Sequence, residues 1–459
     1  MDKRALAGLL DLAQLPAPLI DRVDLAGGDP VLPTCYKPGE AGATAIGAAG
    51  LAAALLWELK TGRLQQSAVD VRAAALAMRS THYLRIDGRM PPRDPQDLSG
   101  FYRLADGQWI FLHCAFANVR AANLSVLQAA NTREDIARAV ACRHGKDLED
   151  RLSAAGGVGA LARSESDWRQ LPEYAALSGA PVLEIARIGD APPQGLPDGG
   201  RPLSGIRVLD LTRVLAGPTC ARTLAEHGAD VLKISGPGLA DSGFFDLDTG
   251  LGKRSAFVDL RSADGRDTLR RLAQGCDVFS QSYRPGSLAA KGFSPEALAR
   301  LRPGIVCVEL SAWSRLGPWR GRRGYDTVVQ ATNGMALGPD GGKPEMLPVS
   351  MQDYVAGYLL AYGAMVALRR RALEGGSWRV SACLSGVGQW IRSLGRLAPE
   401  AYRGVPADLP QAEIAPLLMR TESPAGSLTH LRPILRMSET PPHWQLPAVP
   451  LGHHRPAWD

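Results

Sequence analysis

Two neighbouring stretches decide the fold: residues 324–334, GYDTVVQATNG, and residues 351–357, MQDYVAG. A long apolar run without proline follows from Tyr354 to Leu373, and it ends in three arginines before a Gly-Gly pair. Basic residues in the last turn and glycine just beyond it are typical of the end of a helix. The sequence therefore predicts one buried helix with Asp353 at its beginning.

Asp353 has two explanations at this position. The free N–H groups and the positive end of the helix dipole favour an anionic side chain in the first turn, so we expect Asp353 to be ionised there. An Asp at a helix start is, taken alone, more often a helix cap than a catalyst. The other motifs of the chain decide between these roles.

Composition is that of a soluble globular protein. The 459 residues, 45% hydrophobic and 21% charged, can bury at least two cores. The chain has no apolar run of about 18 residues and no pattern of a signal peptide, so we expect a cytoplasmic protein without membrane contact. Its seven cysteines form no C-x-x-C pair, which argues against structural disulfides and a metal site.

The net charge of +6 is carried mainly by arginine and is spread along the chain. Without a run of basic residues, no nucleic-acid surface is predicted. Guanidinium groups suit phosphates, so a polyanionic ligand is compatible with this charge, although the charge identifies none.

A segment rich in Pro and Gly, residues 191–202, divides the chain. It cannot form a helix or a central strand, so we expect it to link residues 1–190 to a catalytic domain of residues 203–393. Residues 394–459 are rich in proline and poor in apolar runs, which predicts an extended tail on the surface.

After the linker, short apolar runs alternate with helical segments. Strands are predicted at 206–211, 231–234, 256–260, 278–281 and 305–310, and helices at 219–226, 263–273 and 295–301. This alternation predicts an α/β fold with a doubly wound, Rossmann-like parallel sheet. The first strand is not followed by G-x-G-x-x-G, so the dinucleotide fingerprint is missing.

The segment before the linker resembles the segment around Asp353. A shift of 313 positions places Gly62 on Gly375, and both copies then have a helix of small residues, a glycine stop and a short strand. The alternative is chance, because any two helices rich in Ala and Leu align tolerably. The same shift places Glu40 on Asp353, as the remnant of a second, altered site.

Six motifs follow one another between about residues 203 and 395. They are GIRVLDLTRVLAGP at 205–218, GADVLKI at 228–234, GKRS at 252–255, YRPG at 283–286, GYD at 324–326 and QDYVAG at 352–357. In this order they resemble the class III CoA-transferase family, also called the CaiB/BaiF family. Six ordered motifs are far more specific than any one of them.

The resemblance implies the architecture of that family: a doubly wound sheet, a second and smaller α+β domain, and two chains interlocked as a homodimer. A strand hairpin predicted at residues 102–110, with its turn at Asp106 and Gly107, is similar to the family's small domain. The family places its catalytic half first, whereas here a copy of the second half precedes it.

In the resembled family an Asp matching Asp353 attacks an acyl-CoA thioester. The implied reaction moves CoA from an acyl-CoA to a carboxylate acceptor through a mixed anhydride and an aspartyl-CoA thioester on Asp353. Coenzyme A thioester is then a substrate, and no covalently bound cofactor or metal is implied. A carboxylate suits this task because each step exchanges one leaving group for another of similar energy.

Tyr325 stands where the family's acyl-CoA racemases have a histidine. A tyrosine with a pKa of about 10 is a poor base at pH 7, so Tyr325 favours transfer over racemisation. Alternatively, Tyr325 has no catalytic role and only packs in the core or lines the ligand site. For CoA, the resemblance implies backbone contacts at Leu215 and Ala216. It implies phosphate contacts at Lys253, Arg254 and Arg284, and contacts along the pantetheine channel at Arg323 and Asp326.

The chain departs from the family pattern at three places. Residues 235–239 lose an arginine that contacts the adenosine end, Ser282 and Tyr283 replace Asn-Phe, and residues 374–378 replace a Thr-Gly-x-Gly-Gln turn. Two alternatives therefore stay open: an acyl-CoA racemase or isomerase on the same scaffold, and a non-catalytic partner subunit that binds a CoA ester. The sequence does not indicate the acyl donor or acceptor.

Overall fold

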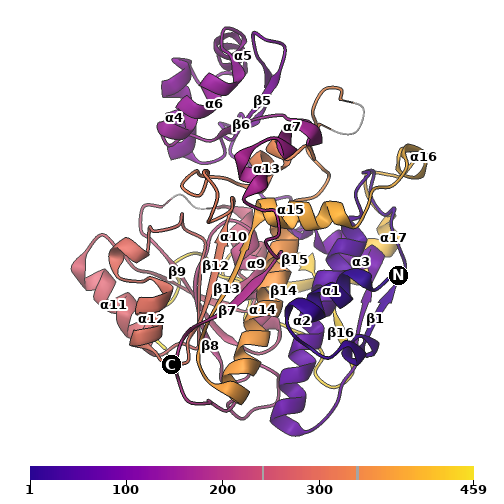
Figure 1. Ribbon diagram of the computed structural model, residues 1–459, viewed down its shortest axis with the longest axis vertical. Helices are drawn as coiled ribbons and strands as arrows, with labels where there is room; N and C mark the ends of the chain where they lie inside the picture. The colour runs from indigo at the N-terminus through magenta and orange to yellow at the C-terminus, as the bar shows by residue number, and fades with distance from the viewer. Residues whose placement is uncertain (240–241, 338–340, 459) are drawn as a thin grey trace.

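The computed structural model of the protein describes residues 1–239, 242–337 and 341–458 (Figure 1). Its centre is a seven-stranded sheet in the order β10-β9-β8-β11-β12-β13-β7, in which β8 to β13 are parallel and β7 is antiparallel to β13. The chain winds outward from β8 in both directions, which confirms the predicted α/β class. The strands are β7 (Glu184–Gly189), β8 (Arg207–Leu211), β9 (Asp230–Ser235), β10 (Lys253–Phe257), β11 (Val278–Gln281), β12 (Val306–Ser311) and β13 (Ser377–Cys383).

Helices cover both faces of this sheet. One apolar cluster joins the sheet to α9 (Ala216–Glu226) and α14 (Met351–Glu374), and a second joins it to α11 (Ala263–Gln274) and α12 (Pro295–Leu301). Four predicted strands and all three predicted helices are found within a few residues of their expected bounds. The third strand was placed wrongly: β10 lies at 253–257, because the chain leaves the sheet before Asp259 to begin α11.

The predicted helix after Asp353 is α14. Its residues from Met351 to Leu368 are all buried, so the helix has no polar face. It packs against α9 on one side and against α2 (Pro38–Thr61) on another. Gly357 allows the contact with α9, since a Cβ there would lie 2.6 Å from the carbonyl oxygen of Ala216.

The N-terminal residues form a second, smaller sheet beside the first. It has the order β1-β2-β16, and its last strand comes from the far end of the chain. The helix α2 is long and apolar enough to cross a membrane, yet 89% of its most apolar window is buried inside the fold, as expected for a core helix. The elements are α1 (Arg4–Leu12), η1 (Ala17–Arg22), β1 (Val23–Ala26), β2 (Ser67–Asp70), α3 (Val71–Ala77), η2 (Ser80–His82) and β16 (Arg436–Met437).

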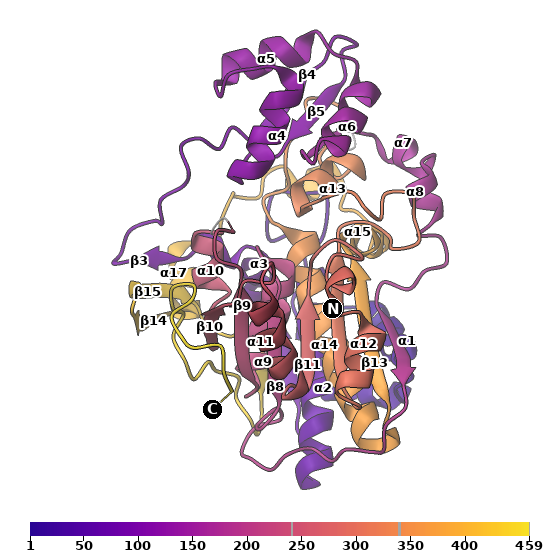
Figure 2. The same ribbon diagram turned by 90° about the vertical axis from the view of Figure 1, so that its left-hand side faces the viewer.

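A small α+β domain lies beyond one end of the large sheet (Figure 2). Its hairpin turns at Asp106 and Gly107 as predicted, and Gly107 has the positive φ of 81° that such a turn needs. The short helix α13 (Asp326–Thr332) of the catalytic half packs against β5 and β6 of this domain. The small domain contains β4 (Gly100–Arg103), β5 (Trp109–Leu112), α4 (Ala117–Leu127), α5 (Arg133–Ala141), α6 (Gly145–Ala154) and β6 (Gly159–Leu161), and α7 (Glu165–Arg169) and α8 (Pro172–Ala175) lead back to β7.

The linker at 191–202 has no helix or strand, as expected, but the segment after residue 393 is not a simple surface tail. Leu428, His430 and Leu435 are buried, and β15 pairs with β3 (Arg85–Ile86). Single apolar residues separated by prolines are buried here by contacts with distant segments, which composition does not reveal. The segment forms α16 (Pro399–Tyr402), α17 (Gln411–Ile414), η4 (Ala415–Leu417), β14 (Leu418–Ser423), β15 (Gly426–Leu431) and β16.

The contact between α14 and α9 predicts opposite effects for two glycine substitutions. Gly357→Ala should lower the free energy of unfolding by about 1–3 kcal/mol, because the added methyl group overpacks the interface. Gly8→Ala in α1 should raise it by about 0.5–1 kcal/mol, since no neighbouring atom lies within 4 Å. Urea unfolding measures both, and equal midpoints for the two variants would contradict the packing described.

Candidate active site

Asp353 is the third residue of α14, and a second aspartate performs the capping. The backbone N–H of Asp353 donates to Oδ2 of Asp326 at 3.0 Å, and Gln330 Nε2 donates to Oδ1 of Asp326. Among the residues that the structure describes, no hydrogen bond to the Asp353 carboxylate is found. The side chain of Asp353 is therefore not needed to hold the helix end.

The two carboxyl groups are buried side by side. Asp353 is 8% exposed, and burial, reinforced by the charge of Asp326, raises the pKa of Asp353 well above its usual range. Burial also raises the pKa of Asp326 to about 6, against the opposing effect of its N–H donors. The expectation that the helix dipole keeps Asp353 ionised is wrong, because the loss of water outweighs it.

Tyr325 lies directly before Asp326 and is covered by the small domain. Its ring stacks on His113 with centroids 4.1 Å apart, and the ring of Phe116 lies 5.3 Å away. Burial lowers the pKa of His113 to about 4 and raises the pKa of Tyr325, so both side chains are neutral at pH 7. Sequence reasoning missed His113, although a histidine inside the apolar run FLHCAF was a visible signal.

The loop after β8 carries backbone strain next to this site. Val214 has φ of +68°, which is costly for a β-branched residue, and it packs in the same apolar cluster as Phe116 and Tyr325. Leu215 and Ala216 follow and are buried at the start of α9. The carbonyl group of Ala216 lies against Gly357, one turn beyond Asp353, so α9 begins near the start of α14.

Two predicted phosphate ligands are engaged elsewhere. Lys253 is fully buried in β10 and its Nζ lies 2.9 Å from Asp210 Oδ2 and 2.8 Å from the Pro218 carbonyl oxygen. Arg254 forms two hydrogen bonds of 2.8 and 2.9 Å with Asp230. These contacts attach β10 to β8, to the first turn of α9 and to β9, so both side chains stabilise the fold.

The other predicted cations are not engaged in buried ion pairs with any residue that the structure describes. Arg284 is exposed in the loop after β11, and Arg323 donates from Nη1 to the Gly156 carbonyl oxygen of the small domain at 2.6 Å. Arg213, which the sequence analysis did not single out, lies over the ring of Phe116 at 5.9 Å. The charges of Arg213 and Arg323 act on Tyr325 and oppose the larger effect of burial on its pKa.

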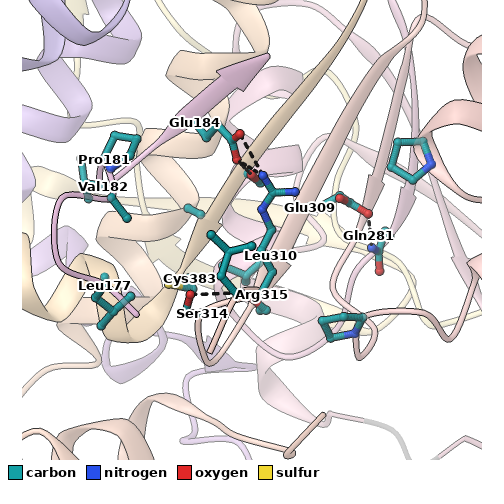
Figure 3. Close-up of a pocket in the computed structure, with 18 of the residues that line it drawn as sticks. Leu177, Pro181, Val182, Glu184, Gln281, Glu309, Leu310, Ser314, Arg315 and Cys383 are labelled. Carbon is teal, nitrogen blue, oxygen red and sulfur yellow. Dashed lines mark hydrogen bonds and ion pairs between the residues drawn. The ribbon is translucent and has the colours of Figure 1, made fainter. Parts of the chain in front are cut away.

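A cavity of about 890 Å³ opens at the carboxyl ends of β11, β12 and β13 (Figure 3). Its charged lining consists of Glu184, Glu296, Glu309 and Arg315, and Arg315 donates to Glu184 at 2.6 and 2.8 Å. Three carboxylates against one guanidinium do not suit phosphates. Asp353 is not part of the lining, so this cavity is separate from the carboxylate pair.

Comparison with known proteins identifies the family. The model of CoA-transferase family III matches residues 203–394. A probable fatty acyl-CoA transferase of Mycobacterium tuberculosis is 30% identical over 269 residues, which are 53% of this chain and 67% of that protein. The chain belongs to CoA-transferase family III. The resemblance carried by the six sequence motifs is thereby confirmed.

Other members of CoA-transferase family III match shorter parts. The succinyl-CoA:glutarate CoA-transferase of Mus musculus is 36% identical over 190 residues, which are 38% of this chain and 43% of that protein. The crystal structure of a CaiB/BaiF family protein from Brucella suis shares 26% identity at a TM-score of 0.38, over 50% of this chain and 65% of that one. The chain thus spans less than half the length of the mouse relative.

The buried carboxylate predicts that Asp353→Asn stabilises the fold at neutral pH. The raised pKa means that the folded state binds the Asp353 proton more tightly than the unfolded state does. Protonation of Asp353 therefore stabilises the fold fully at about pH 4, and this contribution is lost as the pH rises through the pKa of the folded state. The variant, which has no charge to bury, should melt higher than the wild type at pH 7.5 and at the same temperature at pH 4.

Asp326→Ala is the matched control. It removes the acceptor for the Asp353 N–H and should lower the free energy of unfolding by about 1 kcal/mol. Thermal unfolding followed by circular dichroism compares the three proteins. A lower melting temperature for Asp353→Asn at pH 7.5 would show that the carboxylate has a stabilising partner.

Proposed function

We propose that this member of CoA-transferase family III moves CoA from an acyl-CoA to a carboxylic acid acceptor, with Asp353 as the nucleophile. The proposal rests on the buried carboxyl group of Asp353. This group does not cap α14, because Asp326 accepts the hydrogen bond at the start of the helix. A buried carboxyl group without hydrogen-bond partners destabilises a fold, and buried groups with shifted pKa values cluster at active sites. Folding does not explain Asp353, whereas nucleophilic catalysis does.

The proposed reaction exchanges one leaving group in each step. Asp353 must first lose its proton to water, because its raised pKa favours the neutral acid. A carboxylate oxygen then bonds to the acyl carbon, the C–S bond breaks, and CoA leaves as a thiolate, which gives a mixed anhydride. The thiolate attacks the carbonyl carbon of Asp353 and releases the donor acid as a carboxylate. The acceptor carboxylate then attacks the aspartyl-CoA thioester and expels CoA as a thiolate, which gives a second mixed anhydride. The thiolate attacks the acyl carbon of the acceptor in this anhydride, so that the new acyl-CoA forms and the Asp353 carboxylate is released.

The surroundings of Asp353 support this chemistry. The anhydride must be kept from water, and we propose that His113 and Phe116 of the small domain, which contact the ring of Tyr325, exclude it. The first N–H groups of α9 lack acceptors within their helix, and we propose that those of Ala216 and Gly217 stabilise the oxyanion. Arg284 is the exposed cation for the CoA phosphates.

The isomerase alternative needs a base for the α-proton of the acyl group. Tyr325 stays protonated at pH 7 because its pKa is raised, and the pKa of His113, lowered by burial to about 4, makes its neutral imidazole a weak base. Transfer is therefore favoured, and acyl-CoA incubated with the enzyme in D2O should gain no deuterium at the α-carbon. The acyl groups and the cytoplasmic location stay predictions.

The aspartyl thioester can be trapped chemically. After incubation with an acyl-CoA and hydroxylamine, peptide mass spectrometry should find a hydroxamate on Asp353 and on no other carboxyl group. Asp353→Asn is the control, with no adduct and turnover reduced at least about 1,000-fold. Normal turnover in that variant would refute the proposed nucleophile, and CoA binding without an adduct in the wild type would favour a non-catalytic subunit.

A further inference from the structure

The chain contains two copies of one helix-strand-helix unit. The helices α2 and α14 have 24 residues each, and their bounds, 38–61 and 351–374, differ by the 313 positions of the predicted shift. The strands β2 and β13 end at Asp70 and Cys383, which the same shift relates, and α3 and α15 (Leu384–Ser393) begin directly after them. The predicted repeat is therefore confirmed.

The acidic residues of the two copies share one backbone contact, although Glu40 is also paired with Lys37 at 3.4 Å. Glu40 is the third residue of α2, and its backbone N–H donates to Oδ2 of Asp29 at 2.8 Å. This repeats the bond from Asp353 to Asp326. Both helices thus begin with a carboxylate whose N–H is held by a separate aspartate.

The two copies also exchange their last strands. In each sheet the order is a parallel pair followed by an antiparallel strand, β12-β13-β7 in one and β1-β2-β16 in the other. Ser381 of β13 faces Glu184 of β7, and the equivalent Ala68 of β2 faces Arg436 of β16. Because β7 follows the N-terminal copy and β16 the C-terminal copy, each copy completes the sheet of the other.

A pair of glycines shows that this exchange is the same in detail. A Cβ on Gly363 would contact Leu183, directly before β7, and a Cβ on the equivalent Gly50 would contact Leu435, directly before β16. Both glycines allow the leucine of the exchanged strand to reach the long helix. Chance similarity of two Ala-rich helices does not produce this correspondence.

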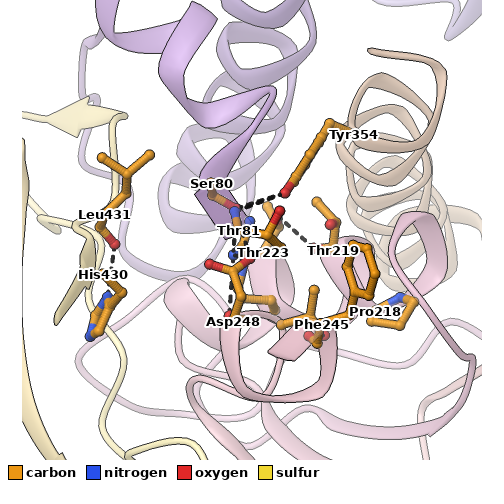
Figure 4. Close-up of polar contacts among 12 residues, drawn as sticks. Ser80, Thr81, Pro218, Thr219, Thr223, Phe245, Asp248, Tyr354, His430 and Leu431 are labelled. Atoms are coloured by element: carbon orange, nitrogen blue, oxygen red, sulfur yellow. Dashed lines mark hydrogen bonds and ion pairs between the residues drawn. The ribbon is translucent and has the colours of Figure 1, made fainter. Parts of the chain in front are cut away.

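The N-terminal copy also contacts the residue next to Asp353 (Figure 4). The hydroxyl groups of Ser80 and Tyr354 lie 3.0 Å apart, and the N–H of Thr81 donates to the Tyr354 hydroxyl at 3.3 Å. Ser80 also donates to Asp248, which forms a buried ion pair of 2.7 Å with Arg222 of α9. The start of α14 is therefore held by both copies.

We infer that one polypeptide folds as two interlocked subunits, in which residues 1–190 serve as the partner subunit of the Asp353 site. They supply the covering side chains His113 and Phe116, the strand β7 and the helix that packs along α14. In the described residues, the sheet around β2 contains no counterparts of β8 to β11, so the large sheet lies beside the Asp353 centre and not beside Glu40. The Asp353 site is then complete within one chain, and a monomer suffices to form it.

A pair of cysteines tests whether the strand is exchanged within one chain. Glu184→Cys with Ser381→Cys places two thiols on directly opposed residues of β7 and β13, where a disulfide can form. Oxidation of the double variant should give a monomer that migrates faster on a non-reducing gel. The single variants are controls for the native cysteines, and Ala68→Cys with Arg436→Cys tests the second exchange in the same way.

A covalent dimer from either double variant would overturn the inference in favour of an interlocked homodimer. If neither disulfide forms, the native mass decides: light scattering should give 48.9 kDa across the concentration range, and a doubled mass would refute a monomer. Neither measurement uses enzyme activity, so failure of the CoA-transfer proposal would leave this test unaffected.

Discussion

The burial of α14 from Met351 to Leu368 is the constraint on which the rest of the structure depends. A helix without a polar face must be covered on every side, and the central sheet with α9 covers only part of it. The remaining cover is α2, a helix of matching length from the other end of the chain. Asp353 is therefore placed by two segments that are distant in sequence.

Buried ion pairs fix the elements around this helix. Lys253 with Asp210, Lys233 with Asp246, and Arg222 with Asp248 each join different parts of the catalytic half in water-free surroundings. Such pairs give little net stability, but the loss of one partner leaves an uncompensated charge. Their geometry therefore specifies one arrangement of β10, α9 and α10 (Phe244–Asp248).

Local signals predicted the catalytic half well, because its strands are continuous apolar runs between helices with clear ends. The repeat was visible too, through the glycines that stop both long helices. The capping by Asp326 and the covering by His113 were not predictable, since they bring together residues far apart in sequence. Lys253 was assigned to the CoA phosphates by the family resemblance, and its burial in β10 was not foreseen because that strand was expected to begin three residues later.

The exchanged strands also set the order in which the protein can be completed. The sheet begun by β1 and β2 is closed by β16, and the adjoining bond from the Gln66 N–H to Ser438 Oγ spans 372 residues. During synthesis the open edge of β2 must wait until Arg436 and Met437 of β16 have emerged. Contacts of such long range slow folding and leave strand edges open to aggregation, so the nascent chain depends on protection of this edge until β16 is made.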